Sequence, residues 1–309
     1  MQLNELNEGV YYIDAGVNLG LVTAPSGQAL LIDTGLDETV AKRVLKLLAG
    51  QGSSPAFTLR AVVVTHAHAD HSGGAAYLAR TTGAPVLASA FERTGLEFPL
   101  WEPVYLFGGA YPPAPLRSKF TFAPPVHVDG ILEPGRLAPP GCPFEVEVVA
   151  LPGHSLGQIG IAARGVLFCA DAVVGPEVIA KHGLPLNADL GRTLETFDLL
   201  IQRSSAGTDR LIVPAHGRPT AEVGPLADAN RARVSEGLDF FRASVAEGPR
   251  SAEDLVAAAA ARFGTTITNL AQYYLAHLTA LAYLGYLCDR GELDTDYRDG
   301  RQLFIGPRP

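Results

Sequence analysis

Apolar residues follow two different periods along the first half of the chain. Strand-like apolar runs are predicted at residues 9–13, 21–24, 29–32, 61–65 and 85–89. After Asp37, apolar residues recur at helical spacing until Gly50, which predicts an amphipathic helix. A second helix is predicted over residues 75–81. Strands mixed with helices in this way predict an α/β (α+β) fold.

The mixed pattern returns in the second half, before the chain becomes helical. Strands are predicted at residues 144–152, 158–163, 165–173 and 210–215, with a helix at 193–203. From Glu222 the pattern is helical until a terminal hairpin, whose turn residues are Arg298, Asp299 and Gly300. This shift predicts a catalytic domain over residues 1–230 and a small, mainly helical domain over residues 231–309.

One internal segment, residues 91–125, shows no clean period and is rich in Pro, Gly and aromatic residues. A segment of this length without a regular pattern indicates a functional lid or insertion, with a packed surface loop as the alternative. Its aromatic residues could wall a pocket and its cations could bind an anionic substrate, or all could be ordinary core and surface positions. The residues concerned are Tyr105, Phe107, Tyr111, Arg117 and Lys119.

The charge and composition of the chain limit the classes of partner that it is expected to bind. The formal net charge of −8 disfavours nucleic acid as a partner, because an acidic surface repels phosphates. The first ten residues have no basic flank before an apolar run, so we expect a cytoplasmic protein rather than a secreted one. The most apolar stretch, residues 275–288, is too short to span a bilayer and is predicted to be a buried helix. A small-molecule substrate is therefore expected.

The strongest chemical signal is the segment Thr65-His66-Ala67-His68-Ala69-Asp70-His71, directly after a buried strand. On an extended backbone, side chains two residues apart point the same way, so His66 and His68 can bind one ion together. A turn at Ala69 would send Asp70 and His71 to a neighbouring position. Mixed imidazole and carboxylate ligands are typical of catalytic rather than structural zinc sites.

Three further candidate ligands each follow a strand-like run: His154 in PGHS, Asp171 in CADAV and His216 in PAHG. With this set the chain resembles the metallo-β-lactamase superfamily, whose signature is HxHxDH followed by His, Asp and His in this order. All seven positions match, and Asp33 in LIDTG matches an early strand motif whose aspartate lies near the metals. The resemblance covers about residues 9–220.

The resemblance implies a four-layer αββα sandwich with two divalent metal ions at the edge of its two sheets. Zinc is the favoured metal, with iron and manganese as alternatives. A metal-bridging hydroxide would be the nucleophile, and Asp70 would be the catalytic residue that orients it or moves its proton. By analogy with the family, one ion is held by His66, His68 and His154, the other by Asp70, His71 and His216, and Asp171 bridges the two.

The expected activity is hydrolysis of a small ester, thioester or lactone, as in glyoxalase II-like enzymes. Asp171 stands where common β-lactamases of this superfamily carry cysteine, and His68 stands where diiron flavoproteins of this fold carry glutamate, so both branches are disfavoured. A phosphodiesterase or endoribonuclease activity, a mononuclear-iron persulfide dioxygenase and a DNA-binding sensor remain alternatives.

The C-terminal segment is similar to the winged-helix-like tail of some members and is expected to pack on the catalytic domain. A homodimer through this tail or the 91–125 insertion is a further expectation.

Overall fold

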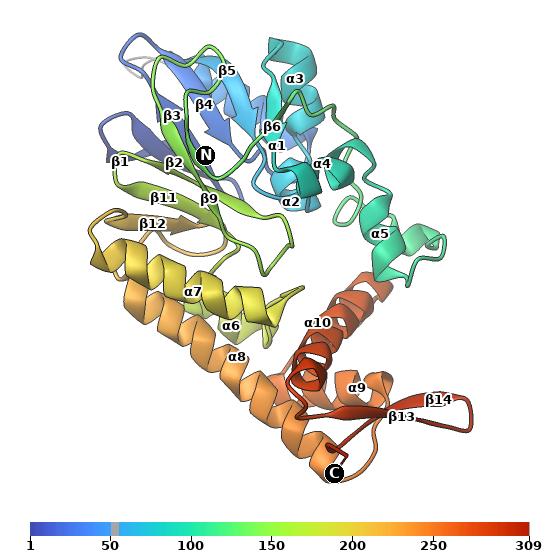
Figure 1. The fold of residues 1–309 in the computed structure, drawn as a ribbon. Helices are drawn as coiled ribbons and strands as arrows, with labels where there is room; N and C mark the ends of the chain where they lie inside the picture. The colour runs from blue at the N-terminus through green and yellow to red at the C-terminus, as the bar shows by residue number, and fades with distance from the viewer. Residues whose placement is uncertain (51–55, 309) are drawn as a thin grey trace.

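The computed structural model describes residues 1–50 and 56–308, and its core is two β-sheets packed face to face with helices on both outer faces (Figure 1). The first sheet has seven strands in chain order: β1 (Leu3–Asn7), β2 (Val10–Asp14), β3 (Asn18–Thr23), β4 (Gln28–Ile32), β5 (Thr58–Val63), β6 (Val86–Ala88) and β7 (Gly130–Ile131). Strands β1 to β4 pair antiparallel, whereas β4 to β7 pair parallel.

The second sheet has five strands in the order β12 (Leu211–Pro214), β11 (Val166–Ala170), β10 (Ile159–Ala163), β9 (Val146–Ala150) and β8 (Gly135–Leu137). Only the β11–β12 pair is parallel. Apolar residues such as Leu30, Ile32, Ile161 and Phe168 fill the space between the two sheets. Gly20 on β3 lets the sheets approach, because a Cβ atom there would lie 2.8 Å from the Phe168 ring.

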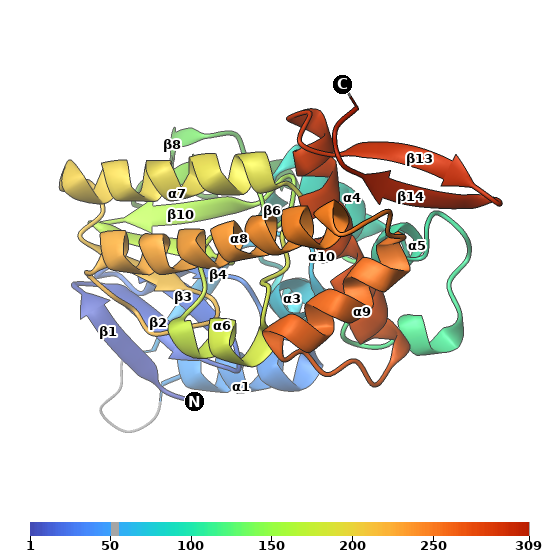
Figure 2. The same cartoon turned by 90° about the horizontal axis from the view of Figure 1, so that it is seen from below.

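Helices cover the outer face of each sheet, which completes the four layers expected from the sequence. Helices α1 (Glu38–Leu48) and α3 (Ala75–Thr82) lie on the first sheet, and Val44, Leu48 and Leu78 pack against its strands. Asp37 begins α1 by accepting hydrogen bonds from two backbone N–H groups of the first turn. Helices α7 (Leu190–Ser205) and α8 (Val223–Ala246) lie side by side on the second sheet (Figure 2).

The segment 91–125 is more regular than its sequence suggested. It contains most of α4 (Ala90–Glu97), all of α5 (Trp101–Leu106) and a 3₁₀ turn, η1 (Ala114–Leu116). These elements are too short to show a clear period, and Pro103 lies within α5. Both α5 and η1 contact the C-terminal helix α10, and the Phe107 and Tyr274 rings meet edge to face at 5.3 Å.

The C-terminal region contains α9 (Ala252–Phe263), α10 (Leu270–Asp289) and the hairpin β13 (Asp294–Arg298) and β14 (Arg301–Ile305). The predicted hairpin turn is confirmed, since Asp299 and Gly300 have φ of 49° and 73°, as a two-residue turn with both central residues left-handed requires. The stretch expected to be a buried helix lies within α10. No helix in the described residues is long and apolar enough to cross a bilayer.

One hydrophobic cluster joins the second sheet to these C-terminal helices. It runs from Leu167 in the sheet through Phe241 of α8 to Leu255 of α9 and Tyr283 of α10. Helix α8 passes without interruption through residues 230 and 231. The domain boundary at these residues therefore stays a prediction, whereas packing of the C-terminal helices on the rest of the chain is observed.

Candidate metal centre

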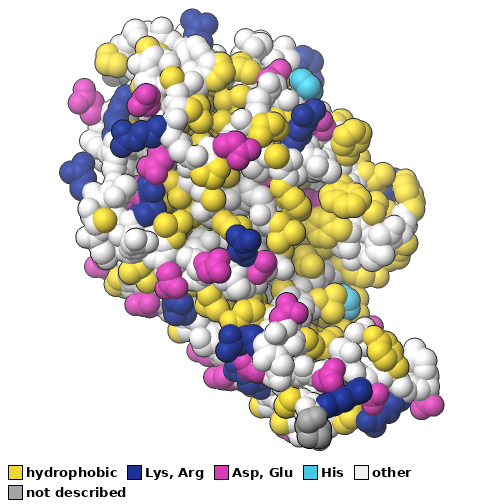
Figure 3. Space-filling model, in the orientation of Figure 1, with side chains coloured by type: hydrophobic (Ala, Val, Ile, Leu, Met, Phe, Trp, Pro, Cys, Tyr) yellow, Lys and Arg dark blue, Asp and Glu magenta, His cyan; other side chains and the backbone are white. Residues whose placement is uncertain are grey.

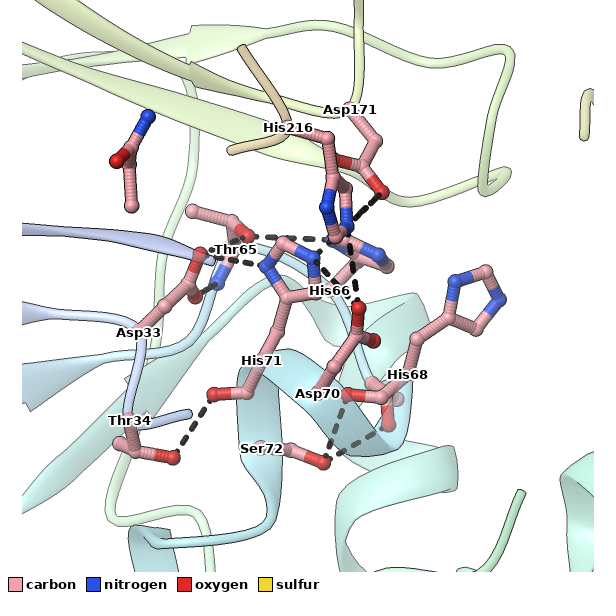
Figure 4. Close-up of polar contacts among 12 residues, drawn as sticks. Asp33, Thr34, Thr65, His66, His68, Asp70, His71, Ser72, Asp171 and His216 are labelled. Atoms are coloured by element: carbon pink, nitrogen blue, oxygen red, sulfur yellow. Dashed lines mark hydrogen bonds and ion pairs between the residues drawn. The ribbon is translucent and has the colours of Figure 1, made fainter. Parts of the chain in front are cut away.

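Loops at the ends of strands from both sheets bring the seven candidate ligands together. His66 and His68 follow β5, and the one-turn helix α2 (Ala69–Ser72) places Asp70 and His71 beside them. From the second sheet, Asp171 follows β11 and His216 follows β12, and both face the histidines of the first sheet (Figure 4). His154 arrives from the loop between β9 and β10.

The donor atoms form three overlapping groups, each with its atoms within 4.8 Å of one another. These groups are His66, His68 and His154; His66, His71 and Asp171; and Asp70, His71 and His216. Asp171 lies at the centre, with Oδ2 3.4 Å from His154 Nε2 and 3.6 Å from His216 Nε2. Its carboxylate therefore lies between the first and third groups.

Several of the atoms that could bind a metal in this cluster are buried and have no hydrogen-bond partner in the described part of the chain. They are His66 Nε2, His71 Nε2 and Asp171 Oδ1. A buried polar atom left unsatisfied costs about 1–3 kcal/mol, so a protein interior keeps few of them. A cation bound by these atoms would remove that cost, and nitrogen and carboxylate donors in this number fit divalent transition metals.

Burial and neighbouring charges set the protonation states of the candidate ligands. Burial and the adjacent imidazoles lower the pKa of His68 to about 3, and burial likewise lowers the pKa of His66 and His154. These rings are therefore neutral at pH 7, the form that binds a metal. Burial alone would raise the pKa of Asp70, but His71 and His216 lower it to about 2, so its carboxylate is ionised.

Further contacts fix the orientation of the ligand rings. Asp33, at φ 61°, accepts a hydrogen bond from His71 Nδ1 at 2.8 Å and two more from the backbone and hydroxyl of Thr65, both at 2.8 Å. His154 Nδ1 lies 2.8 Å from the carbonyl oxygen of Leu186, to which it can donate. In both histidines Nε2 is left to face the cluster, which is the arrangement typical of metal-binding imidazoles.

Glu92 is a supporting residue that the sequence analysis missed. Its side chain on α4 is buried and joins two ligand-bearing loops. It accepts hydrogen bonds from the backbone N–H of Ala67 at 2.8 Å, from Ser155 Oγ at 2.5 Å and from the backbone N–H of Gly157 at 3.1 Å. The spacing Ser89-x-x-Glu92 signals the start of a helix, but no local pattern indicates contacts to loops 25 and 65 residues away.

A cavity of about 860 Å³ opens at the ligand cluster. Glu102 and Phe120 from the segment 91–125 line it, as do Lys181 and His182 from α6 (Pro176–His182). None of the five residues of that segment considered as possible pocket residues is among its lining residues, which favours the alternative of ordinary core and surface positions. Instead Lys119 pairs with Asp37 at 3.2 Å, and the Arg117 guanidinium lies 5.1 Å from the centre of the Tyr111 ring.

Comparisons with known proteins agree with this geometry. Residues 13–216 match the family model described as the Metallo-beta-lactamase superfamily. The chain is 30% identical over 149 residues to a hydroxyacylglutathione hydrolase from Methylobacillus flagellatus, covering 48% of this chain and 44% of that protein. It is 32% identical over 129 residues to the enzyme of that name from Pseudomonas entomophila, covering 42% and 35%. The matches therefore span less than half of these relatives.

Two solved structures have the same fold along nearly the whole chain. A metallo-beta-lactamase family protein from Thermus thermophilus has a TM-score of 0.73 at 22% identity and covers 98% of this chain and 100% of its own. A beta-lactamase domain protein from Burkholderia ambifaria has a TM-score of 0.71 at 22% identity, covering 98% and 93%. The C-terminal helices are thus part of the shared architecture.

Proposed function

Because the chain belongs to the metallo-beta-lactamase superfamily, we propose that it is a metal-dependent hydrolase with two divalent ions that cleaves an ester, thioester or lactone. The observation that carries the proposal is the convergence of seven candidate ligand side chains, three of which have a buried atom without a hydrogen-bond partner among the described residues. His66, His68 and His154 would hold one ion, Asp70, His71 and His216 the other, and Asp171 both. Zinc is the proposed metal, because imidazole and carboxylate donors in this mixture suit it.

In the proposed reaction the oxygen of water bonds to the acyl carbon, the bond to the leaving oxygen or sulfur breaks, and a proton passes to the leaving group. The bound ions would make water nucleophilic at neutral pH and polarise the acyl oxygen. Asp70 is the proposed catalytic residue. Its side chain is 37% exposed and its pKa of about 2 keeps it ionised, so it can accept a hydrogen bond from the attacking water and orient it.

Thioesters and esters are the first substrates to test. The curated relatives that match part of the chain are hydroxyacylglutathione hydrolases, which supports acyl transfer to water. The net charge of −8 favours an uncharged acyl substrate over a polyanion such as RNA. The cytoplasmic location and the homodimer stay predictions.

The proposal is tested by elemental analysis together with a hydrolysis screen. We expect close to two zinc ions per chain and turnover of esters or thioesters that is lost on chelation and restored by zinc. The variant Asp171→Asn should lose turnover, whereas Asp228→Asn on the exposed face of α8 should keep it. One iron per chain with oxygen uptake would instead support the dioxygenase alternative, and cleavage of RNA alone would support the nuclease.

A further inference from the structure

The cavity that begins at the metal centre continues far into the C-terminal helices. One end is lined by five of the seven ligands, including Asp70 and His216. The other end is lined by residues of α8, α9 and α10. These three helices also contribute residues, among them Phe241 and Tyr283, to the hydrophobic cluster described above. The same cavity therefore connects a polar reaction site with an apolar interior.

Most residues that line the far end are apolar, and several of them have small side chains; the polar ones from α8 and α10 are Asn230, Gln272 and Thr279. Helices α9 and α10 contribute four alanines, Ala259, Ala260, Ala276 and Ala280. The other apolar residues at this end are Val234, Phe241, Val256, Phe263 and Leu275. Within the described chain, the lining residues from α8, α9 and α10 include no charged side chain. Lys181 and His182 of α6 also line the cavity, and the His182 carbonyl accepts a hydrogen bond from Thr265 just after α9, so this end is mainly but not wholly apolar.

The cavity is large enough to hold a small molecule. A volume of about 860 Å³ falls in the range of pockets that hold small-molecule ligands. Larger side chains at Ala260 and Ala276, which are partly exposed, would narrow this end of the cavity.

We propose that the far end of the cavity is an acyl pocket, and that the centre hydrolyses esters or thioesters with a medium-length aliphatic acyl group. This inference rests on the proposed hydrolase function and names its substrate class. The acyl carbon would lie beside Asp70 and Asp171, and the chain would extend between α9 and α10. A short, polar hydroxyacyl group would leave these apolar walls without a partner. Apolar side chains also gather on the outer face where α5 lies beside α10 (Figure 3).

The first experiment measures kcat/KM for zinc-loaded protein on p-nitrophenyl esters and N-acetylcysteamine thioesters from acetyl to dodecanoyl. Each methylene that enters an apolar pocket contributes about 0.8 kcal/mol, which is about a fourfold rise in kcat/KM. We expect this rise over several methylenes and then a plateau, where the chain fills the pocket. A flat or falling series, or a preference for lactoyl thioester over octanoyl thioester, would overturn the proposal.

Matched variants locate the effect. Ala276→Phe and Ala260→Leu fill the pocket from facing helices and should flatten the chain-length series, so that octanoyl esters no longer react faster than acetyl esters. Ala257→Phe places bulk on the exposed side of α9 and should leave the whole series unchanged. Equal losses at every chain length in both pocket variants would show that they disturb the metal centre, and would count against an acyl pocket.

A binding measurement separates this proposal from the hydrolase proposal. Displacement of a fluorescent fatty acid by decanoate, followed in metal-free protein, reports on the pocket without turnover. We expect decanoate to displace the probe far better than butyrate, and Ala276→Phe to weaken displacement at least tenfold. If no ester reacts but decanoate binds in this way, the hydrolase proposal fails and the apolar pocket stands. If esters react but decanoate does not bind, the pocket proposal fails alone.

Discussion

The substitution Glu92→Gln isolates what one buried carboxylate contributes to the metal centre. In the native protein both carboxylate oxygens accept hydrogen bonds, Oε2 from the Ala67 backbone and Oε1 from Ser155 and the Gly157 backbone. Glutamine has the same shape but only one acceptor oxygen. Whichever way its amide turns, one backbone N–H then faces an NH₂ group and loses its acceptor.

The size of the effect follows from that lost acceptor. A buried backbone donor without a partner costs about 1–3 kcal/mol. Part of this loss is offset, because burial raises the pKa of Glu92 and the glutamine no longer carries a charge that is costly to bury. We expect the free energy of unfolding to fall by about 1–2 kcal/mol. Metal affinity should fall about tenfold, because outer contacts of this kind hold ligands in place.

Urea unfolding of metal-free protein and competition with a chromophoric chelator measure the two effects. Ser155→Ala removes one donor but leaves both backbone N–H groups satisfied, so it should lose less than Glu92→Gln in both assays. Glu195→Gln, exposed on α7, is the matched control and should behave as wild type. If Glu92→Gln equals Glu195→Gln in stability and metal affinity, or if Ser155→Ala costs more than Glu92→Gln, the carboxylate does not join the loops as argued.

Other supporting contacts give further expected outcomes. Asp33→Asn keeps a backbone conformation that asparagine tolerates but replaces an acceptor of the His71 hydrogen bond, so chelator competition should show metal binding weakened about 10- to 100-fold without loss of secondary structure by circular dichroism. Arg203→Met leaves the buried carboxylate of Asp209 without its cation and should lower the free energy of unfolding in urea by about 3 kcal/mol. The hydrogen bond from Arg203 also lowers the pKa of Glu147. The stability contributed by the ionised Glu147 is therefore fully present above pH 4.5, the ordinary pKa of glutamate, and is lost as the pH falls through the lower pKa of the folded state. The unfolding midpoints of wild type and Arg203→Met should therefore approach each other below pH 4, and a constant gap would contradict the ion pair. Chelation of the zinc-loaded protein should lower Tm, with recovery on adding zinc, and an unchanged Tm would refute metal binding by the buried cluster.

Four of the candidate ligands could be predicted because they lie together in one short segment. His66, His68, Asp70 and His71 lie within six residues, after a strand whose apolar run fixes where the loop begins. The terminal hairpin was predictable for the same reason, since Asp299 and Gly300 suit left-handed backbone and the strands flank them directly. In both cases the residues that decide the structure are neighbours in the sequence.

The parts that escaped prediction depend on distant contacts. Glu92 reaches Ala67 and Gly157, which no period in the sequence connects with it. The alanines of α9 and α10 are ordinary helix formers, and only the packing of three helices turns them into walls of a cavity. For the 91–125 segment, several aromatic and basic residues stood out in the sequence, whereas the residues of this segment that line the cavity are Glu102 and Phe120.

The metal centre and the far end of the cavity are held in place by different sets of contacts. Asp33, Glu92 and the Leu186 carbonyl orient the ligand loops by hydrogen bonds, whereas apolar packing among α8, α9 and α10 shapes the far end. No hydrogen bond in the described part of the chain joins these supporting residues to α9 or α10. Substitutions in separate sets without shared partners act additively. Combining Glu92→Gln with Ala276→Phe should therefore give the metal affinity of the first variant and the chain-length profile of the second, and a coupled change in either property would show that the pocket and the centre move together.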